Sequence, residues 1–256
     1  MTQLKPRSKS THLKSVESVA QDSHISPWLS RIIYSIGSHV VLPLFFGNIQ
    51  IEGQENIPLH DPVIIAPTHR SRWDALVVPY ALGRLVSGRD LRFMVSADEV
   101  KGIQGWIIRH MGGFPVNTER PQISSIHHSI DLLKTNQEML VIFPEGGIFN
   151  DEQIHPLKRG VALIALQTET SLCDESANTS ITTQDLSTPQ NSVVASPLSV
   201  KILPVRVHYS QPYPTWGTNI KVNIGVPLAV KDYLGKSLRK SSQDLTAAMQ
   251  TSLQKL

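Results

Sequence analysis

The sequence predicts a single α/β domain, with a largely parallel central sheet flanked by helices and an N-terminal helical segment that lies on a membrane surface. Three observations lead to this fold class. Beyond Gly53, short apolar runs typical of strands alternate with longer segments of helical type, which is the pattern of a parallel sheet. The length of 256 residues suits one α/β domain with appendages better than two complete domains. A strongly apolar segment precedes the alternation.

The N-terminal region divides into two parts. Residues 1–24 carry basic side chains but almost no apolar surface, so burial cannot offset the entropy of ordering them, and we expect a disordered basic tail. Residues 25–52 are the most hydrophobic stretch of the chain. A membrane-spanning helix needs about 20 apolar residues, and Arg31 and Pro43 leave too few. We therefore expect an interfacial helix; the alternative is a helix that only packs on the core.

The remaining elements follow from local sequence patterns. Strands are predicted at 63–66, 92–96, 114–116, 139–143, 201–208 and 220–224. Helices are predicted at 73–82, 98–110, 121–135, 157–167 and 238–256. Residues 168–199 are rich in Ser and Thr, contain four acidic residues and no Lys or Arg, and show no period. They predict a disordered acidic insertion within a domain that spans 53–256.

The charge balance indicates the kind of partner. The formal net charge is +3, and the part outside 168–199 carries +7. A basic body suits a membrane surface, a phosphorylated substrate or an acidic carrier protein, whereas the helices lack the basic clusters of a nucleic-acid-binding protein. The single cysteine, Cys173, excludes an intramolecular disulfide and any zinc site with two thiolates, and it favours a reducing compartment.

The first chemical motif lies where the predicted strand 63–66 ends and the next helix begins, a position at which sites collect in α/β sheets. His69 in this loop and Asp74 in the first helical turn can converge. An aspartate that accepts the Nδ1 proton fixes the tautomer of the imidazole and leaves Nε2 as a general base for an external hydroxyl. The alternative is a capping-box variant formed by Ser71 and Asp74, with His69 an ordinary loop histidine.

The second motif is Phe143-Pro144-Glu145-Gly146, at the end of the predicted strand 139–143. A carboxylate there can hold an acceptor hydroxyl or pair with a nearby Arg or Lys. The alternative is a plain strand-ending turn that uses Gly146 and Gly147.

Together these residues resemble the PlsC-type glycerolipid acyltransferases, whose best-known members acylate 1-acylglycerol-3-phosphate in phospholipid biosynthesis. The resemblance covers His69-x-x-x-x-Asp74 and Phe143-Pro144-Glu145-Gly146, with weaker blocks at 112–116, 202–205 and 157–160. It implies an O-acyltransferase in which His69 and Asp74 are the catalytic pair and Glu145 and Gly146 bind the acceptor. No metal or cofactor is implied. The partners implied are a lysolipid acceptor and an acyl-CoA or acyl carrier protein thioester. The apolar segment, the basic tail and the basic body separately predict the cytoplasmic face of a membrane as the location.

The chain departs from the family pattern at the expected phosphate site. Thr118 and Ile148 stand where the family commonly has arginines. Arg120, Lys158 and Arg72 are the cations that we expect to replace them, each with the alternative of a solvated surface charge. The same gaps leave open a different hydroxyl acceptor.

Other classes of protein fit less well. The chain lacks the Gly-x-Ser-x-Gly motif of a serine hydrolase and the glycine loops that cradle nucleotide phosphates. His127, His128 and Asp131 could share part of a helix face, but adjacent histidines point apart, which argues against a metal site. The remaining rival is a non-catalytic lipid-binding protein of the same fold at a membrane surface.

Overall fold

The computed structural model describes residues 25–117, 122–135, 138–182 and 198–256. An eight-stranded sheet forms the centre of the molecule, in the order β1-β7-β6-β2-β5-β3-β4, with the short β8 (Leu228–Ala229) paired to β6. Its strands are β1 (Ile49–Glu52), β2 (Val63–Pro67), β3 (Asp90–Ser96), β4 (Gly113–Val116), β5 (Glu138–Val141), β6 (Lys201–Tyr209) and β7 (Ile220–Ile224).

The sheet is largely parallel, as predicted from the sequence. Strands β6, β2, β5, β3 and β4 all run in one direction, whereas β7 is antiparallel to β6. Every residue of β2 is buried, because helices cover both faces of the sheet at this position. The carboxyl ends of the parallel strands therefore meet at one edge, where the loops after β2 and β5 emerge together.

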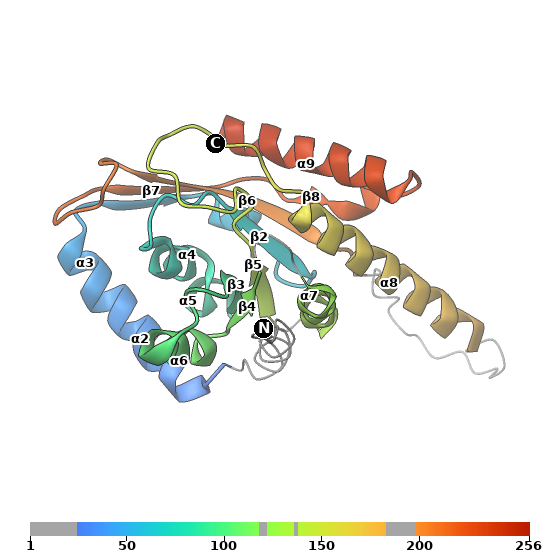
Figure 1. Cartoon of the computed structure of the whole chain (residues 1–256), viewed down its shortest axis with the longest axis horizontal. Helices are drawn as coiled ribbons and strands as arrows, with labels where there is room; N and C mark the ends of the chain where they lie inside the picture. The colour runs from blue at the N-terminus through green and yellow to red at the C-terminus, as the bar shows by residue number, and fades with distance from the viewer. Residues whose placement is uncertain (1–24, 118–121, 136–137, 183–197) are drawn as a thin grey trace, which may run out of the picture.

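Two hydrophobic cores lie on opposite faces of the sheet (Figure 1). One lies beneath α4 (Asp74–Leu82) and the N-terminal helical segment, and it includes Val77, Leu82 and Leu42. The other lies beneath α7 (Ile123–Thr135), α8 (Gly160–Thr182) and α9 (Leu238–Lys255), and it includes Leu133, Leu166 and Leu245. The shorter helices are α5 (Arg84–Ser87), α6 (Gly102–His110), and the 3₁₀ turns Gln54–Asn56 and Val230–Tyr233.

The acidic insertion begins later than the sequence indicated. Helix α8 continues to Thr182, and Thr168 and Glu169 at its middle are buried. The Glu169 carboxylate accepts hydrogen bonds from the Ser199 hydroxyl and the Val200 amide, at 3.0 and 2.5 Å. The prediction of disorder from residue 168 was therefore wrong. The polar composition of this segment did not reveal the helix, in which Glu169 anchors the start of β6. Residues 183–197 of the predicted insertion lie outside the described residues, as does the predicted tail at 1–24.

The N-terminal boundary also differs from the prediction. Strand β1 lies within 25–52, yet it pairs in parallel with β7, with Ile49 opposite Ile220. The sheet therefore begins before residue 53. Strand β1 was not predicted from the sequence, because a four-residue edge strand is too short to establish an alternating pattern.

The apolar segment forms a continuous helical stretch of α2 (Pro27–Ile36), a π-helical turn (Gly37–Val41) and α3 (Leu42–Phe45). Trp28–Phe45 is long and apolar enough to cross a membrane, with a mean hydropathy of 1.2, so the expectation that Arg31 and Pro43 leave too few apolar residues was wrong on this criterion. One side of the helix packs on the body of the protein through Leu42 and Gly37. Only 22% of the stretch is buried in the molecule.

Candidate active site

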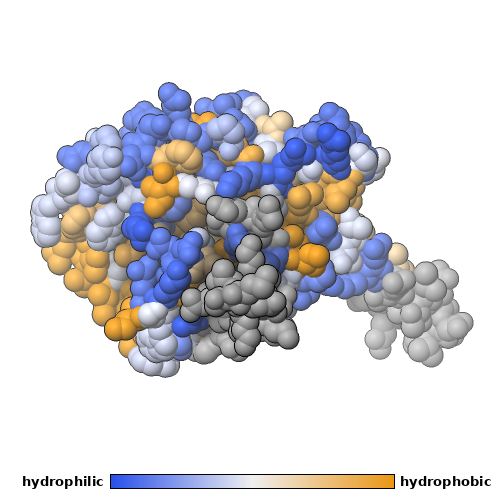
Figure 2. Space-filling view, viewed as in Figure 1, coloured by the Kyte–Doolittle hydropathy of each residue, from blue (hydrophilic) through white to orange (hydrophobic). Residues whose placement is uncertain are grey.

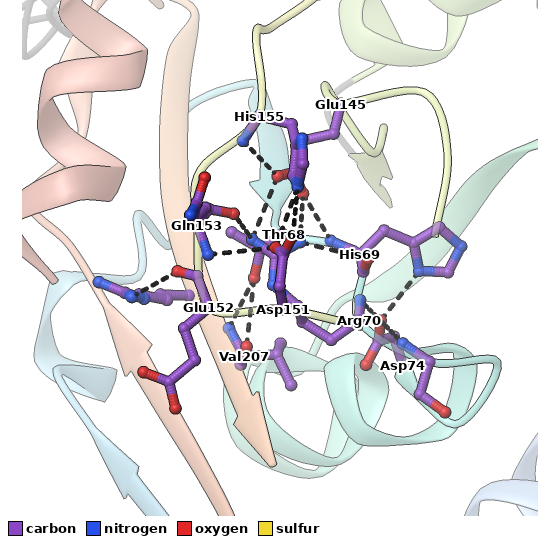
Figure 3. Close-up of polar contacts among 12 residues, drawn as sticks. Thr68, His69, Arg70, Asp74, Glu145, Asp151, Glu152, Gln153, His155 and Val207 are labelled. Atoms are coloured by element: carbon purple, nitrogen blue, oxygen red, sulfur yellow. Dashed lines mark hydrogen bonds and ion pairs between the residues drawn. The ribbon is translucent and has the colours of Figure 1, made fainter. Parts of the chain in front are cut away.

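The loops after β2 and β5 bring the two sequence motifs together at the carboxyl edge of the sheet. Thr68 N donates to Val205 O at 2.9 Å, and the Thr68 hydroxyl accepts from the Val207 amide at 2.9 Å. These bonds fix the exit of β2 against β6, so the position of His69 is determined by the neighbouring strand. The residues lie as shown in Figure 3.

His69 and Asp74 form the predicted pair. The Nδ1 atom of His69 lies 2.9 Å from Oδ2 of Asp74, and the Asp74 side chain is fully buried. A carboxylate at this distance favours the tautomer with its hydrogen on Nδ1. Among the described residues, none forms a hydrogen bond with Nε2, and one fifth of the His69 side chain is exposed.

Only one half of the alternative capping box is formed, because the Ser71 hydroxyl accepts from Trp73 N and not from Asp74 N. Asp74 is the first residue of α4, and its Oδ2 accepts from the amides of Arg70 and Ser71 at 2.7 and 3.0 Å. The bond from Ser71 N is the reciprocal half of a capping box. The same oxygen that holds His69 therefore orders the loop that carries it.

The plane of the His69 ring is fixed by an aromatic neighbour. The imidazole stacks on Phe143, with ring centroids 3.9 Å apart and planes inclined by 18°. The His69 carbonyl accepts from Phe149 N at 2.9 Å, which ties the loop after β5 to the loop after β2. Stacking and the Nδ1 bond together leave the ring little rotational freedom.

A buried ion pair lies beside the His69–Asp74 pair. The Arg70 guanidinium donates to both oxygens of Glu145 in a bidentate pair, at 2.9 and 3.1 Å, and both side chains are almost completely buried. Arg70 also donates to the Gln153 carbonyl at 2.8 Å. Charge-assisted bidentate pairs of this kind are strong and directional.

The sequence allowed Glu145 either to hold an acceptor hydroxyl or to pair with a cation. In the structure it pairs with the cation Arg70. Its carboxylate also accepts from His69 N and His155 N, each at 3.0 Å. Two backbone and two guanidinium bonds use all the lone pairs of the carboxylate. Glu145 therefore organises the loops around His69 and has no lone pair left for an acceptor hydroxyl.

Gly146, the residue after Glu145, lies against the side chain of Lys158. Gly146 has a φ of +71°, which requires glycine in practice, and a Cβ atom there would lie 2.5 to 2.7 Å from the end of the Lys158 side chain. Lys158 N donates to Pro144 O at 2.8 Å, which fixes the lysine beside the turn. Lys158 is exposed and, within the part of the chain that the structure describes, makes no ion pair.

The structure does not place the other two predicted cations, Arg72 and Arg120, beside Gly146. Arg72 forms a bidentate pair with Glu99, with both distances 2.9 Å, and its side chain is 71% exposed. The guanidinium lowers the pKa of the Glu99 carboxyl through this hydrogen bond. Arg120 lies outside the described residues.

In the described ranges no group of three or more His, Cys, Asp and Glu side chains is placed to hold a metal ion. His128 is instead half-buried in α7 against Phe114, with ring centroids 4.8 Å apart. Burial and the nearby Arg92 lower the pKa of His128. These contacts account for the histidine as part of the protein interior.

Comparison with known proteins gives the family. A family model described as Acyltransferase matches residues 48–207, which is more than half of the chain. The chain belongs to the acyltransferase family. Its His69–Asp74 and Glu145–Gly146 motifs both lie inside the matched region, whereas the whole apolar helical stretch precedes it.

Two curated relatives carry the name 1-acyl-sn-glycerol-3-phosphate acyltransferase. The protein of Streptococcus pneumoniae is 30% identical over 141 residues, and that of Bacillus subtilis is 33% identical over 121 residues. The matches cover 53% and 46% of this chain and 50% and 57% of those proteins, so the chain spans about half the length of the curated relatives it matches.

A solved structure of similar fold is the 1-acyl-sn-glycerophosphate acyltransferase PlsC from Thermotoga maritima. It superposes with a TM-score of 0.59 at 18% identity, covering 88% of this chain and 78% of the other. This likeness establishes the α/β fold of the acyltransferase domain.

Sequence reasoning missed two residues that hold the site together. Arg70 directly follows His69, and the sequence allowed Glu145 to pair with a nearby Arg or Lys, but Arg72 and Lys158 were equally available as partners. Tyr209, whose hydroxyl contacts Asp74, is 135 residues away in the sequence and carried no local signal.

We expect Arg70→Met to destabilise the fold by about 3–5 kcal/mol, because it leaves the Glu145 carboxylate buried without its cation. Urea unfolding of the purified protein measures the change. The matched control is Arg72→Met, which removes an exposed pair and is expected to cost less than about 1 kcal/mol. Equal effects of the two variants would contradict the organising role of the Arg70–Glu145 pair.

Proposed function

We propose that this protein transfers a fatty acyl group from a thioester donor to the free hydroxyl of a lysolipid, with 1-acylglycerol-3-phosphate as the acceptor and phosphatidate as the product. The observation that carries the proposal is the His69–Asp74 pair, with Nδ1 held and Nε2 available at the carboxyl edge of the sheet. Both curated relatives are named for this activity. A non-catalytic lipid-binding role has no comparable use for this buried pair.

The geometry supports a general-base mechanism. Nε2 of His69 accepts the proton of the acceptor hydroxyl as its oxygen attacks the thioester carbonyl. Asp74 orients the ring and stabilises the imidazolium that forms. When the tetrahedral intermediate collapses, the carbon–sulfur bond breaks and the imidazolium returns its proton to the thiolate. The products are the ester and a free thiol, from coenzyme A or acyl carrier protein.

For the acceptor phosphate, Lys158 is the cation that the described residues favour. Its side chain lies against the turn at Gly146, and no described carboxylate neutralises it. Arg72 is engaged by Glu99, and the proposal for Arg120 rests on its place in the sequence. A phosphate dianion bound at this edge would gain a charge-assisted bond from Lys158.

We expect His69→Ala to lower kcat/KM for acyl transfer by about 10² to 10⁴-fold, because positioned base catalysis contributes that much. Asp74→Asn should also be severely impaired, since the tautomer is no longer fixed. The assay follows thiol release from an acyl thioester with lysophosphatidate as acceptor. The control is His127→Ala, an exposed residue of α7. Near wild-type turnover in His69→Ala would exclude the proposed base.

A second expectation concerns the acceptor. Lys158→Ala should raise the KM for lysophosphatidate by about tenfold, the effect of losing one charge-assisted bond, and leave the KM for an uncharged lysolipid unchanged. Arg120→Ala tests the second cation in the same assay. Lys201→Ala, at the amino end of β6, is the control. An equal effect of Lys158→Ala on both acceptors would indicate a different hydroxyl substrate.

We infer that the protein lies on one leaflet through an apolar membrane face. The outward side of the N-terminal helical stretch exposes Trp28, Ile32, Ile36, Val40 and Leu44. Ser26 N donates to His110 O, so the start of α2 lies against the end of α6. Helix α6 adds three exposed apolar side chains, Ile103, Trp106 and Ile107. We call these eight residues the membrane face.

The membrane face supports an interfacial rather than a spanning arrangement. The opposite side of the helical stretch packs on the core through Leu42, and Phe46 directly after it is also in the core, so spanning would require these contacts to break. Apolar surface gathers at the left of Figure 2, where Figure 1 shows α2 and α3. The net positive charge of the body favours the anionic cytoplasmic leaflet.

We expect the double variant Ile32→Asp/Ile36→Asp to weaken binding to anionic phospholipid vesicles by roughly 100-fold, because two apolar anchors are replaced by charges that anionic lipid repels. Vesicle flotation measures bound protein. Val226→Asp, an exposed apolar residue between β7 and β8, is the control. If the wild-type chain stays in solution beside these vesicles, the membrane face is wrong.

A further inference from the structure

The second oxygen of Asp74 has a partner of its own. Oδ2 is occupied by His69 and the two loop amides, whereas Oδ1 accepts a hydrogen bond from the Tyr209 hydroxyl at 2.7 Å. Asp74 is completely buried and Tyr209 is 8% exposed, so water does not compete freely for this bond. A hydrogen bond between a phenol and a buried carboxylate is short and strong.

Tyr209 is held in place by elements other than the catalytic loop. It is the last residue of β6, four positions beyond Val205, which pairs with the end of β2. The antiparallel ladder with β7 fixes its backbone opposite Ile220. Its ring lies 6.1 Å from that of Phe46, between ring centroids. The hydroxyl is therefore aimed at Asp74 by the sheet and not by the loop that carries His69.

The protonation state of Tyr209 suits a permanent donor. Burial and the neighbouring Asp74 carboxylate raise the pKa of Tyr209. The other titratable side chains beside Asp74 are His69 on the same loop and the paired Arg70 and Glu145. The phenol thus stays neutral and can only donate to the carboxylate.

We propose that Tyr209 is a positioning residue of the acyltransferase site, which acts through Asp74 to hold the His69 imidazole in its reactive orientation. Without the phenol, Oδ1 is a buried oxygen with no described donor, and the carboxylate can rotate about its Cβ–Cγ bond. Rotation moves Oδ2 away from Nδ1, so the imidazole loses its orientation. Tyr209 is 8% exposed and its hydroxyl is bonded to Asp74, so the proposal gives it no contact with substrate, and we expect substrate binding to be unchanged.

The test is Tyr209→Phe, which keeps the ring and removes only the hydroxyl. We expect kcat for acyl transfer to fall about tenfold, with KM for donor and acceptor unchanged, since the lost bond is made to a charged group. In the Asp74→Asn background the same substitution should change kcat by less than about twofold, because its route to His69 is already broken. Tyr213→Phe, an exposed tyrosine on the following loop, is the matched control.

A second experiment does not measure turnover. The kinetic test rests on the proposed function, whereas this second test asks only whether Tyr209 affects His69. In the proton NMR spectrum of the wild type, the His69 Nδ1–H bonded to Asp74 gives a low-field signal, assigned by its absence in His69→Ala. We expect this signal to move in Tyr209→Phe and to stay in place in Tyr213→Phe. If the wild type lacks acyl transfer but the signal moves, the proposed function fails and the link from Tyr209 to His69 stands.

Two results would overturn the inference. One is an unchanged kcat and an unmoved signal in Tyr209→Phe. The other is a loss of kcat that is equally large in the Asp74→Asn background, which would indicate a general packing defect. The melting temperature of each variant is measured alongside, so that unfolding is recognised.

Discussion

Two carboxylates buried at the carboxyl edge of the sheet, Asp74 and Glu145, determine the shape of the site. A charged carboxylate is stable in the interior only with hydrogen-bond donors around it, and each of these two accepts several hydrogen bonds. Asp74 collects His69, two loop amides and the Tyr209 phenol, whereas Glu145 collects Arg70 and two further amides. Loops that would otherwise move independently are thereby joined through His69, which donates its ring Nδ1 to one carboxylate and its backbone amide to the other.

This arrangement separates two roles that the sequence alone does not distinguish, the support of the site and the binding of substrate. The carboxylate of Glu145 stands in the motif that follows β5, yet its bonds are all internal, and it serves the site by holding Arg70 and the backbone of His69. In the proposed function, contact with the acceptor phosphate falls to neighbouring residues whose charge is not neutralised, of which Lys158 is the described example. A motif can therefore belong to the site without each of its side chains touching substrate.

The membrane face and the site are linked through aromatic packing. Phe45 at the end of α3 stacks on Trp73, with ring centroids 4.6 Å apart, and Trp73 directly precedes Asp74. Phe46 contacts both Trp73 and Tyr209. The helix proposed to lie on the bilayer thus ends against Trp73 and Tyr209, the neighbours of Asp74.

The sequence by itself determined the fold class, the six main strands and the His69–Asp74 pair, because apolar periodicity and a local motif are properties of neighbouring residues. Local patterns could not find β1, whose only support is its pairing with β7, or the helical start of the polar insertion, which Glu169 stabilises from within. They also did not show which of several cations pairs with Glu145. Only the tertiary structure decided that Arg70 takes this carboxylate and that Tyr209 completes Asp74, because both depend on which strands lie side by side at the carboxyl edge of the sheet.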